Sequence, residues 1–312
     1  MNFRFLKLTS LIVLWIVSSS GCIIFRKSVT SYKETKLPES QAVYDIPYWS
    51  SPEADPVKNR LDLFLPQGQD WPLLVFVHGG EWISGDKSLK VMGSEIYRNI
   101  GRYFASQGVG TAIINYRLIP QTDWKSQIMD VARAVTWLHA NIKNYHGNPQ
   151  QIFVMGHSSG AQLAARIALD PKFLKSLNAS PSMLCGIIPV SGAGYDLTDE
   201  ETYALAQKDD LFEKLFHKGD IPASLRRQLS PQKFVNSKAP PFLVMYSEKE
   251  EKELQKGSIR LNDELNKVGA SSQIIEIYGE DHKSVVLSLS NPQMVPTNAI
   301  LVFLRTLHCT GT

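Results

Sequence analysis

The chain has 312 residues, of which 43% are hydrophobic and 20% are charged, so it can bury a sizeable core and lacks the composition of a disordered protein. The net charge of +3 is small, and Lys and Arg are interspersed with Asp and Glu, which argues against a nucleic-acid-binding protein. The sequence contains no GxxxxGK[ST], GxGxxG or HExxH motif, so we expect neither a metal nor another cofactor.

Residues 1–22 have the layout of a secretory signal peptide. Arg4 and Lys7 precede an apolar run at 11–17, and small residues lead to Cys22. The end of this segment resembles a bacterial lipobox, whose cysteine is diacylated, although Ser19 stands where leucine is usual. We therefore predict export and anchoring through lipidated Cys22, facing the periplasm or cell exterior. The alternatives are a membrane-anchoring N-terminal segment and a cleaved, soluble secreted protein.

Residues 23–50 are predicted to form a stalk that leads to a single folded domain at 51–312, because polar residues at 28–41 precede a proline-containing stretch at 44–49. Two cysteines remain beyond the stalk. Cys185 and Cys309 could pair in an oxidising compartment. Cys185 lies in an apolar, strand-like run where buried free cysteine is also common, so the sequence leaves both states open.

Short apolar runs alternate with helical patterns from residue 60 onward. The runs that predict strands are 60–65, 73–77, 110–115, 151–155, 185–190, 241–246 and 273–278. The patterns that predict helices are 97–107, 124–144, 161–169, 257–268 and 297–307. This alternation predicts an α/β fold with a mostly parallel central sheet and helices on both faces. Functional groups in such sheets gather at the carboxyl ends of the strands.

A glycine-containing loop, His78-Gly79-Gly80, directly follows the predicted strand at 73–77. Backbone N–H groups in such a loop can approach a substrate closely and stabilise an oxyanion. We predict that Gly79 and Gly80 are such donors, and that His78 is structural; the alternative is an ordinary turn. We expect Glu81 to point away, because a carboxylate facing the oxyanion would oppose catalysis.

Gly156-His-Ser-Ser-Gly160 lies between a predicted strand and a predicted helix, the context that a nucleophile elbow requires. The glycines leave room for a strained turn, and the helix N-terminus favours negative charge. We therefore predict that Ser158 is a nucleophile and that the Ser159 N–H is a further oxyanion donor. A turn rich in small residues is the alternative interpretation.

A serine nucleophile needs a histidine base and a carboxylate that orients the histidine. In this fold the serine, the acid and the histidine typically follow one another in that order along the chain. His217, His282 and His308 follow Ser158 and are therefore the candidates for the base. We predict His282, since it directly follows a strand. The acid is predicted to follow the strand at 241–246, where Glu250 is the first choice and Glu248 and Glu251 stay open.

These residues resemble the esterase/lipase group of α/β-hydrolases, especially its carboxylesterase, feruloyl-esterase-like, isoprenylcysteine methylesterase and kynurenine formamidase branch. The resemblance covers about residues 55–308. It rests on the segments 78–87, 115–118, 130–137, 156–161, 190–197 and 281–282. In similar enzymes the acid is usually an aspartate in a Gly-Asp-x-Asp loop. Ser247-Glu-Lys-Glu250 stands at the place of this loop, with glutamate in place of the acidic aspartate.

The resemblance implies a serine hydrolase that cleaves a small carboxylic ester through an acyl-enzyme, with an insertion at about 197–240 acting as a helical lid. An aryl formamide hydrolase similar to kynurenine formamidase is the alternative within this fold. A non-catalytic binding protein on a hydrolase fold is the alternative from another class. Neither the physiological substrate nor the oligomeric state follows from the sequence.

Overall fold

A computed structural model describes residues 32, 34–208, 210–307 and 309. The predicted signal peptide and its lipidation site Cys22 lie outside these residues. None of the helices within the described part of the chain has the length and apolar character needed to cross a bilayer.

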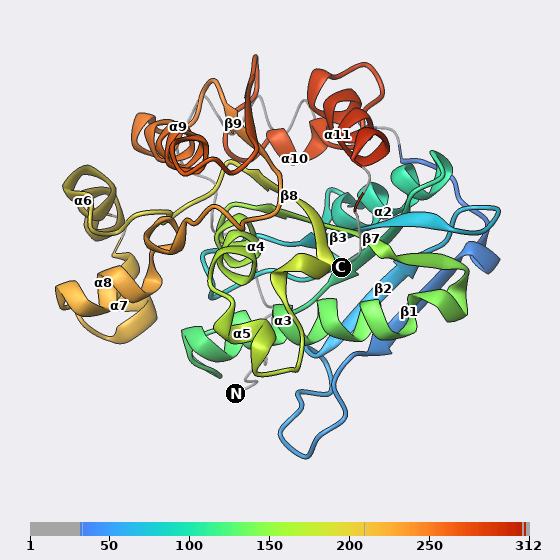
Figure 1. The fold of residues 1–312 in the computed structure, drawn as a ribbon, viewed down its shortest axis with the longest axis horizontal. Helices are drawn as coiled ribbons and strands as arrows, with labels where there is room; N and C mark the ends of the chain where they lie inside the picture. Colours follow the sequence, from blue (N-terminus) through green and yellow to red (C-terminus); the bar gives the residue numbers. More distant parts are fainter. Residues whose placement is uncertain (1–31, 33, 209, 308, 310–312) are drawn as a thin grey trace, which may run out of the picture.

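The centre of the fold is an eight-stranded sheet in the order β1-β2-β6-β3-β7-β8-β9-β10 (Figure 1). Its strands are β1 (Ala42–Pro47), β2 (Arg60–Phe64), β3 (Trp71–Val77), β6 (Gly110–Ile114), β7 (Gly147–His157), β8 (Leu184–Val190), β9 (Phe242–Ser247) and β10 (Ser272–Ile277). All neighbours from β6 to β10 pair in parallel, whereas β2 is antiparallel to both of its neighbours. The predicted α/β fold with a mostly parallel sheet is therefore confirmed.

Helices cover both faces of the sheet, because its strands are apolar on both sides. In β3, Leu73, Val75 and Val77 join one core cluster, and the alternate residues Leu74 and Phe76 join the other. The first cluster includes α3 (Trp124–Asn141), α4 (Ser159–Leu169), α5 (Lys172–Lys175) and α9 (Lys252–Lys267). The second includes α2 (Ile96–Ser106), α10 (Val285–Ser288) and α11 (Val295–Thr306). A two-stranded ribbon, β4 (Lys90–Val91) and β5 (Ser94–Glu95), precedes α2.

The folded part begins before the predicted boundary at residue 51. Residues Ala42–Pro47, which we expected in the stalk, form the edge strand β1 and pair antiparallel with β2. Just after this strand, the Tyr48 hydroxyl donates a hydrogen bond to the Asn115 carbonyl at 2.8 Å. Only Ile46 is buried in β1, so this edge strand lacks the continuous apolar run that reveals a central strand.

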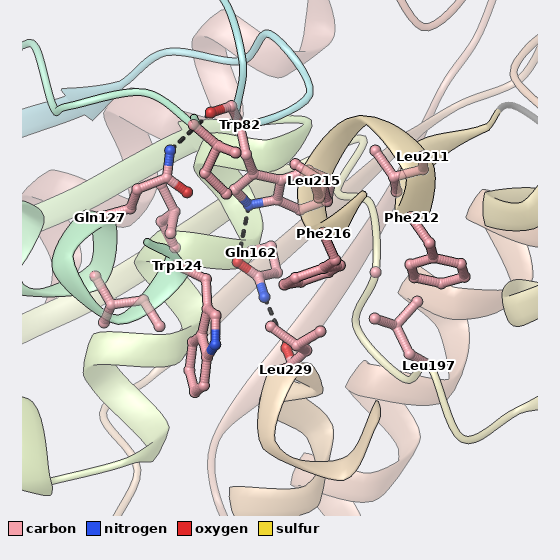
Figure 2. Close-up of a pocket in the computed structure, with 14 residues that line it drawn as sticks. Trp82, Trp124, Gln127, Gln162, Leu197, Leu211, Phe212, Leu215, Phe216 and Leu229 are labelled. Carbon is pink, nitrogen blue, oxygen red and sulfur yellow. Dashed lines mark hydrogen bonds between the residues drawn. The ribbon is translucent and has the colours of Figure 1, made fainter. Parts of the chain in front are cut away.

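An insertion between β8 and β9 forms α6 (Glu200–Lys208), α7 (Leu211–Phe216) and α8 (Ala223–Leu229), in the range where we predicted a helical lid. These helices lie together beside the sheet, at the left of Figure 1. They share a small core of their own that contains Tyr203, Phe212 and Ile221. Side chains of α7 and α8 also face α3 and α4 across a pocket (Figure 2).

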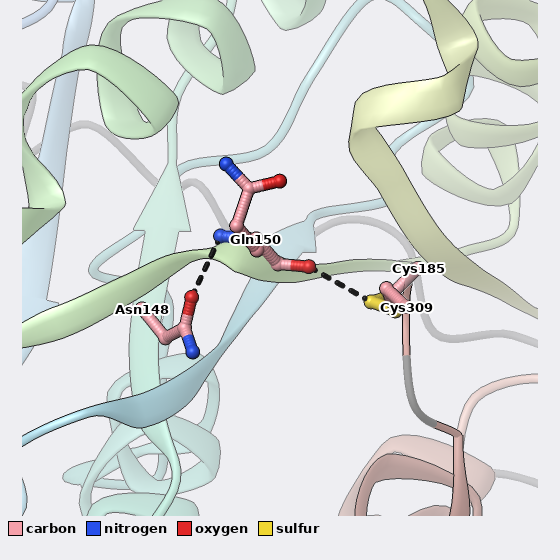
Figure 3. Close-up of a disulfide and its surroundings, with 4 residues drawn as sticks. All are labelled: Asn148, Gln150, Cys185 and Cys309. Carbon is pink, nitrogen blue, oxygen red and sulfur yellow. Dashed lines mark hydrogen bonds between the residues drawn. A yellow bond between two sulfur atoms is a disulfide. The ribbon is translucent and has the colours of Figure 1, made fainter. Parts of the chain in front are cut away.

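A disulfide joins Cys185 in β8 to Cys309, which follows α11 (Figure 3). The two Cα atoms are 5.4 Å apart, within the usual range for a disulfide. The sequence left this pairing open because buried free cysteine is also common in an apolar, strand-like run such as the one around Cys185. The link fastens the end of the chain to a central strand.

Candidate active site

Ser158 occupies a sharp turn between β7 and α4, with φ 55° and ψ −121°. Few non-glycine residues adopt positive φ, and such strain is concentrated at functional sites. The flanking glycines are sterically required. A Cβ on Gly156 would lie 2.2 Å from the Gly160 carbonyl oxygen. A Cβ on Gly160 would lie 2.2 Å from the Val77 carbonyl oxygen. The turn therefore has the geometry that the glycine spacing predicts.

Ser158, His282 and Glu250 form a continuous chain of hydrogen bonds. His282 follows β10, and its Nε2 lies 2.9 Å from the Ser158 Oγ. Its Nδ1 lies 2.9 Å from Oε2 of Glu250, whose side chain is fully buried. An ionised carboxylate can only accept hydrogen bonds, so Nδ1 carries the proton and Nε2 is left to accept from the serine hydroxyl. This arrangement suits removal of the Ser158 proton.

The neighbouring glutamates occupy different places. Glu248 Oε2 accepts a hydrogen bond of 2.7 Å from the Gly279 N–H, which ties together the loops after β9 and β10. Glu251 is exposed and precedes the first turn of α9. Glu250 Oε1 accepts a hydrogen bond of 3.2 Å from the Ser247 N–H, which orients its carboxylate. Of these three candidates, Glu250 is the one that the structure places against His282.

His157, the residue before Ser158, also belongs to the site, although nothing in the sequence indicated a role for its side chain. Its side chain is buried, and its Nε2 donates a hydrogen bond of 2.8 Å to the backbone carbonyl of His282. Burial, reinforced by the nearby His282, lowers the pKa of His157 to about 3, so its imidazole is neutral. His157 therefore links the serine turn directly to the loop that carries His282.

The loop after β3 runs close against the serine. A Cβ on Gly79 would lie 3.0 Å from the Cβ of Ser158, so the glycine is needed for this approach. Gly80, with φ 127°, accepts hydrogen bonds from the N–H groups of the turn that follows it. Ser159 is the first residue of α4, where an N–H has no acceptor within the helix.

Glu81 lies toward the helical insertion. Its side chain is 39% exposed, and its Oε2 is 3.6 Å from Nζ of Lys214 in α7. His78, by contrast, is buried and stacks on Tyr116 with ring centroids 4.4 Å apart. Burial lowers the pKa of His78 to about 4. His78 is thus part of the core that supports the loop.

The family model described as BD-FAE matches residues 61–265. The chain belongs to the BD-FAE family. The resemblance to the esterase group of α/β-hydrolases is therefore confirmed.

Similar proteins include Esterase LipQ of Mycobacterium tuberculosis, 33% identical over 66% of this chain and 48% of that protein. Isoprenylcysteine alpha-carbonyl methylesterase of Arabidopsis thaliana is 29% identical over 75% of this chain and 56% of that protein. The chain thus spans about half the length of these curated relatives. A truncated form of a carbohydrate esterase from gut microbiota has the same fold, with a TM-score of 0.71 and 18% sequence identity. The structural match covers 88% of this chain and 98% of the esterase chain.

Other charged residues of this BD-FAE family member brace the fold. Arg117 Nε and Nη2 bind the two carboxylate oxygens of buried Asp130 at 2.8 and 2.9 Å. Asp196 pairs with Lys233 of the insertion at 2.8 Å. Within the described ranges, no three or more His, Cys, Asp or Glu side chains are grouped so that they could hold a metal ion.

A chain of polar contacts crosses the pocket beside the site (Figure 2). The Trp82 Nε1–H donates to Oε1 of Gln162 at 3.3 Å, and the Gln162 amide donates to the Leu229 carbonyl at 2.7 Å. The Gln127 amide donates to the Trp82 carbonyl at 2.7 Å. These contacts join the loop after β3 to α3, α4 and α8. The sequence did not reveal them, because the partners are far apart along the chain.

Proposed function

We propose that this BD-FAE family member hydrolyses carboxylic esters, with Ser158 as nucleophile, His282 as base and Glu250 as the orienting carboxylate. The observation that carries the proposal is the continuous hydrogen-bonded chain from Glu250 through His282 to Ser158. Membership of the family and similarity to named esterases support the same activity.

In the first half of the reaction, the Ser158 Oγ attacks the ester carbonyl carbon while His282 Nε2 takes the serine proton. The resulting imidazolium is stabilised by the Glu250 carboxylate. The carbon–oxygen bond to the alcohol then breaks, and His282 returns the proton to the departing alcohol. The acyl group is left on Ser158.

In the second half, water attacks the acyl carbonyl carbon while His282 takes a proton from the water. The bond from the acyl carbon to Ser158 Oγ then breaks, His282 returns the proton to Oγ, and the carboxylic acid leaves. Both halves pass through a tetrahedral oxyanion, for which we propose the N–H groups of Gly79, Gly80 and Ser159 as donors. The close approach of Gly79 to Ser158 supports this assignment. Loss of one such donor typically costs about 10²–10³ in rate.

The proposal is tested by hydrolysis of p-nitrophenyl acetate, butyrate and octanoate by the purified protein and its Ser158→Ala variant. We expect turnover by the wild type that disappears in the variant. Absence of turnover in folded wild-type protein would contradict it. A parallel assay with N-formylkynurenine tests the aryl formamide alternative, and inactivity toward both substrate classes would favour a binding role.

We also propose that the protein is exported and anchored to a membrane through lipidated Cys22. The residue pattern of 1–22 and a disulfide suited to an oxidising compartment support this location. Metabolic labelling with palmitate should label the wild type but not Cys22→Ser. Export without any label would favour the soluble secreted alternative.

A further inference from the structure

We infer that Ser191 is a positioning residue of the proposed ester hydrolysis, and that it acts on Glu250 through the hydroxyl of Ser247. The inference rests on the proposed function and adds two side chains to the machinery of that site. The observation that carries it is a pair of hydroxyl groups, with the Ser191 Oγ and the Ser247 Oγ 2.8 Å apart. Both residues are fully buried.

The segment that carries Ser191 lies between the nucleophile and the acid. It follows β8, whose neighbours in the sheet are β7, which leads to Ser158, and β9, which leads to the turn of the acid (Figure 1). On one side, the Ser158 N–H donates to the Val190 carbonyl at 3.0 Å, and the Ala193 N–H donates to the Ser158 carbonyl at 3.4 Å. On the other side, the Ser191 N–H donates to the Met245 carbonyl at 2.8 Å. The backbone of this segment is thus hydrogen-bonded to the elements of both catalytic groups.

The backbone conformation of Ser191 indicates that its side chain is needed. Its φ is 44°, in the left-handed region that glycine adopts without steric cost and other residues rarely adopt. Such strain persists only where the surrounding structure holds it, and it is concentrated at functional sites. Glycine at this position would avoid the strain but would lack a hydroxyl to meet Ser247. We attribute the strained serine to the contact that its hydroxyl makes.

Ser247 passes this restraint to the carboxylate of Glu250. It is the last residue of β9, and its N–H donates to the Glu250 Oε1 at 3.2 Å. The other carboxylate oxygen, Oε2, lies 2.9 Å from Nδ1 of His282. A shift of Ser247 would therefore move the donor that fixes the rotation of the carboxylate. The oxygen that faces the imidazole would move with it, and this oxygen stabilises the imidazolium that forms when the nucleophile loses its proton.

The hydroxyl pair accompanies the replacement of the usual acid. In the loops of similar enzymes, glycine and aspartate usually stand at the positions of Ser247 and Glu250. A glycine has no hydroxyl, so such a loop cannot form this pair. Glutamate has one more rotatable bond than aspartate, and its carboxylate therefore needs more restraint to keep one orientation. The pair of serines supplies a restraint at the residue that binds this longer side chain.

The backbone of the same turn is also held from outside. The Gln255 Nε2 donates to the carbonyls of Ser247 at 3.1 Å and Glu248 at 2.7 Å. The Glu250 N–H donates to the Ser247 carbonyl at 3.4 Å. The turn should therefore remain formed when one hydroxyl is removed. Loss of the pair should disturb the carboxylate without dismantling the site, so we expect a partial loss of rate.

The test is a double-mutant cycle with Ser191→Ala and Ser247→Ala in the full chain, measured on p-nitrophenyl butyrate. We expect each single variant to lower kcat about tenfold with little change in KM, since a buried hydroxyl is left without its partner. The double variant should lose no more than either single variant, because both changes remove the same contact. Ser258→Ala is the matched control. Ser258 is equally buried and its hydroxyl has no partner among the described residues, so kcat should stay unchanged.

A second series repeats Ser191→Ala in the Glu250→Gln background. The Ser191 hydroxyl acts through the carboxylate, so its removal should cause little further loss of kcat once an amide replaces that carboxylate. The same fold-loss in both backgrounds would indicate a purely structural role and would overturn the inference. Wild-type kcat in both single variants, or losses that multiply in the double variant, would overturn it as well, while esterase activity stands. Absence of turnover of every ester by folded wild type would instead overturn the proposed function, and this inference with it.

Discussion

At the scale of single residues, the carboxylate that orients His282 is the assignment most open to test. Glu250→Gln keeps the shape of the side chain but removes the negative charge that stabilises protonated His282, and its amide NH2 can favour the wrong tautomer of the imidazole. We expect kcat to fall by about 10³–10⁴, as in a protease whose orienting carboxylate was replaced by its amide. Glu251→Gln, at an exposed neighbouring position, should retain wild-type kcat. The reverse pattern would contradict the assignment.

His157 is expected to act as a positioning residue through its hydrogen bond to the His282 carbonyl. His157→Phe removes the donor, and we expect kcat to fall about 10–100-fold with little change in KM. His157→Gln retains a nitrogen donor at a similar reach and should restore most of this loss. Equal losses of kcat in both variants would indicate that His157 contributes packing alone.

The same residue makes stability depend on pH. Its pKa is about 3 in the folded protein and ordinarily 6.5, so between these values the unfolded chain binds the proton and the folded chain does not. The free energy of unfolding should therefore fall as pH drops below 6.5, by about 1.4 kcal/mol per pH unit from this group. Denaturant titrations at pH 7, 6 and 5 give the free energy of unfolding at each pH. This free energy should fall less steeply with decreasing pH in His157→Gln than in the wild type. The same pH dependence in both proteins would contradict a buried, neutral His157 in the folded state.

Sequence reasoning reached Ser158 and His282 through their motif and position, but it could only rank the glutamates. Glu248, Glu250 and Glu251 are chemically alike, and their roles differ through the direction in which the loop after β9 turns each side chain. His157 was missed because its partner is a backbone carbonyl, which leaves no signal in residue types.

At the scale of elements, the turn between β7 and α4 depends on glycine by close contact. Gly160→Ala would place a Cβ 2.2 Å from the Val77 carbonyl oxygen, so we expect loss of activity and a lower melting temperature. Gly257 in α9 is a matched control, since a Cβ there would lie 3.9 Å from Tyr195. Gly257→Ala should stabilise the fold by about 0.5–1 kcal/mol and leave activity intact. Full activity of Gly160→Ala would contradict this account of the turn.

The central strands and main helices could be predicted because their apolar runs reflect burial on both faces of the sheet. The edge strand β1 could not, since most of its residues are partly or fully exposed. The pocket network could not either, because Trp82 and Gln162 are 80 positions apart and Gln162 and Leu229 are 67 apart.

At the scale of the whole molecule, the disulfide between Cys185 and Cys309 closes a loop of 124 positions. Removing such a crosslink increases the entropy of the unfolded chain. We expect Cys185→Ser/Cys309→Ser to lower the free energy of unfolding by about 2–5 kcal/mol in denaturant titrations. Esterase activity at low temperature should persist, since the hydrogen bonds of Ser158, His282 and Glu250 do not involve either cysteine. Unchanged stability would argue against the crosslink.

The central claim, that Ser158 is the nucleophile of an ester hydrolase, is tested most directly by covalent labelling. The purified protein is incubated with an alkyl p-nitrophenyl phosphonate, and its mass and peptides are then measured. We expect one adduct per chain, on the peptide that contains Ser158, together with loss of turnover. The His282→Ala variant should be labelled far more slowly. A folded wild-type protein that forms no adduct, or forms it on another residue, would contradict the claim.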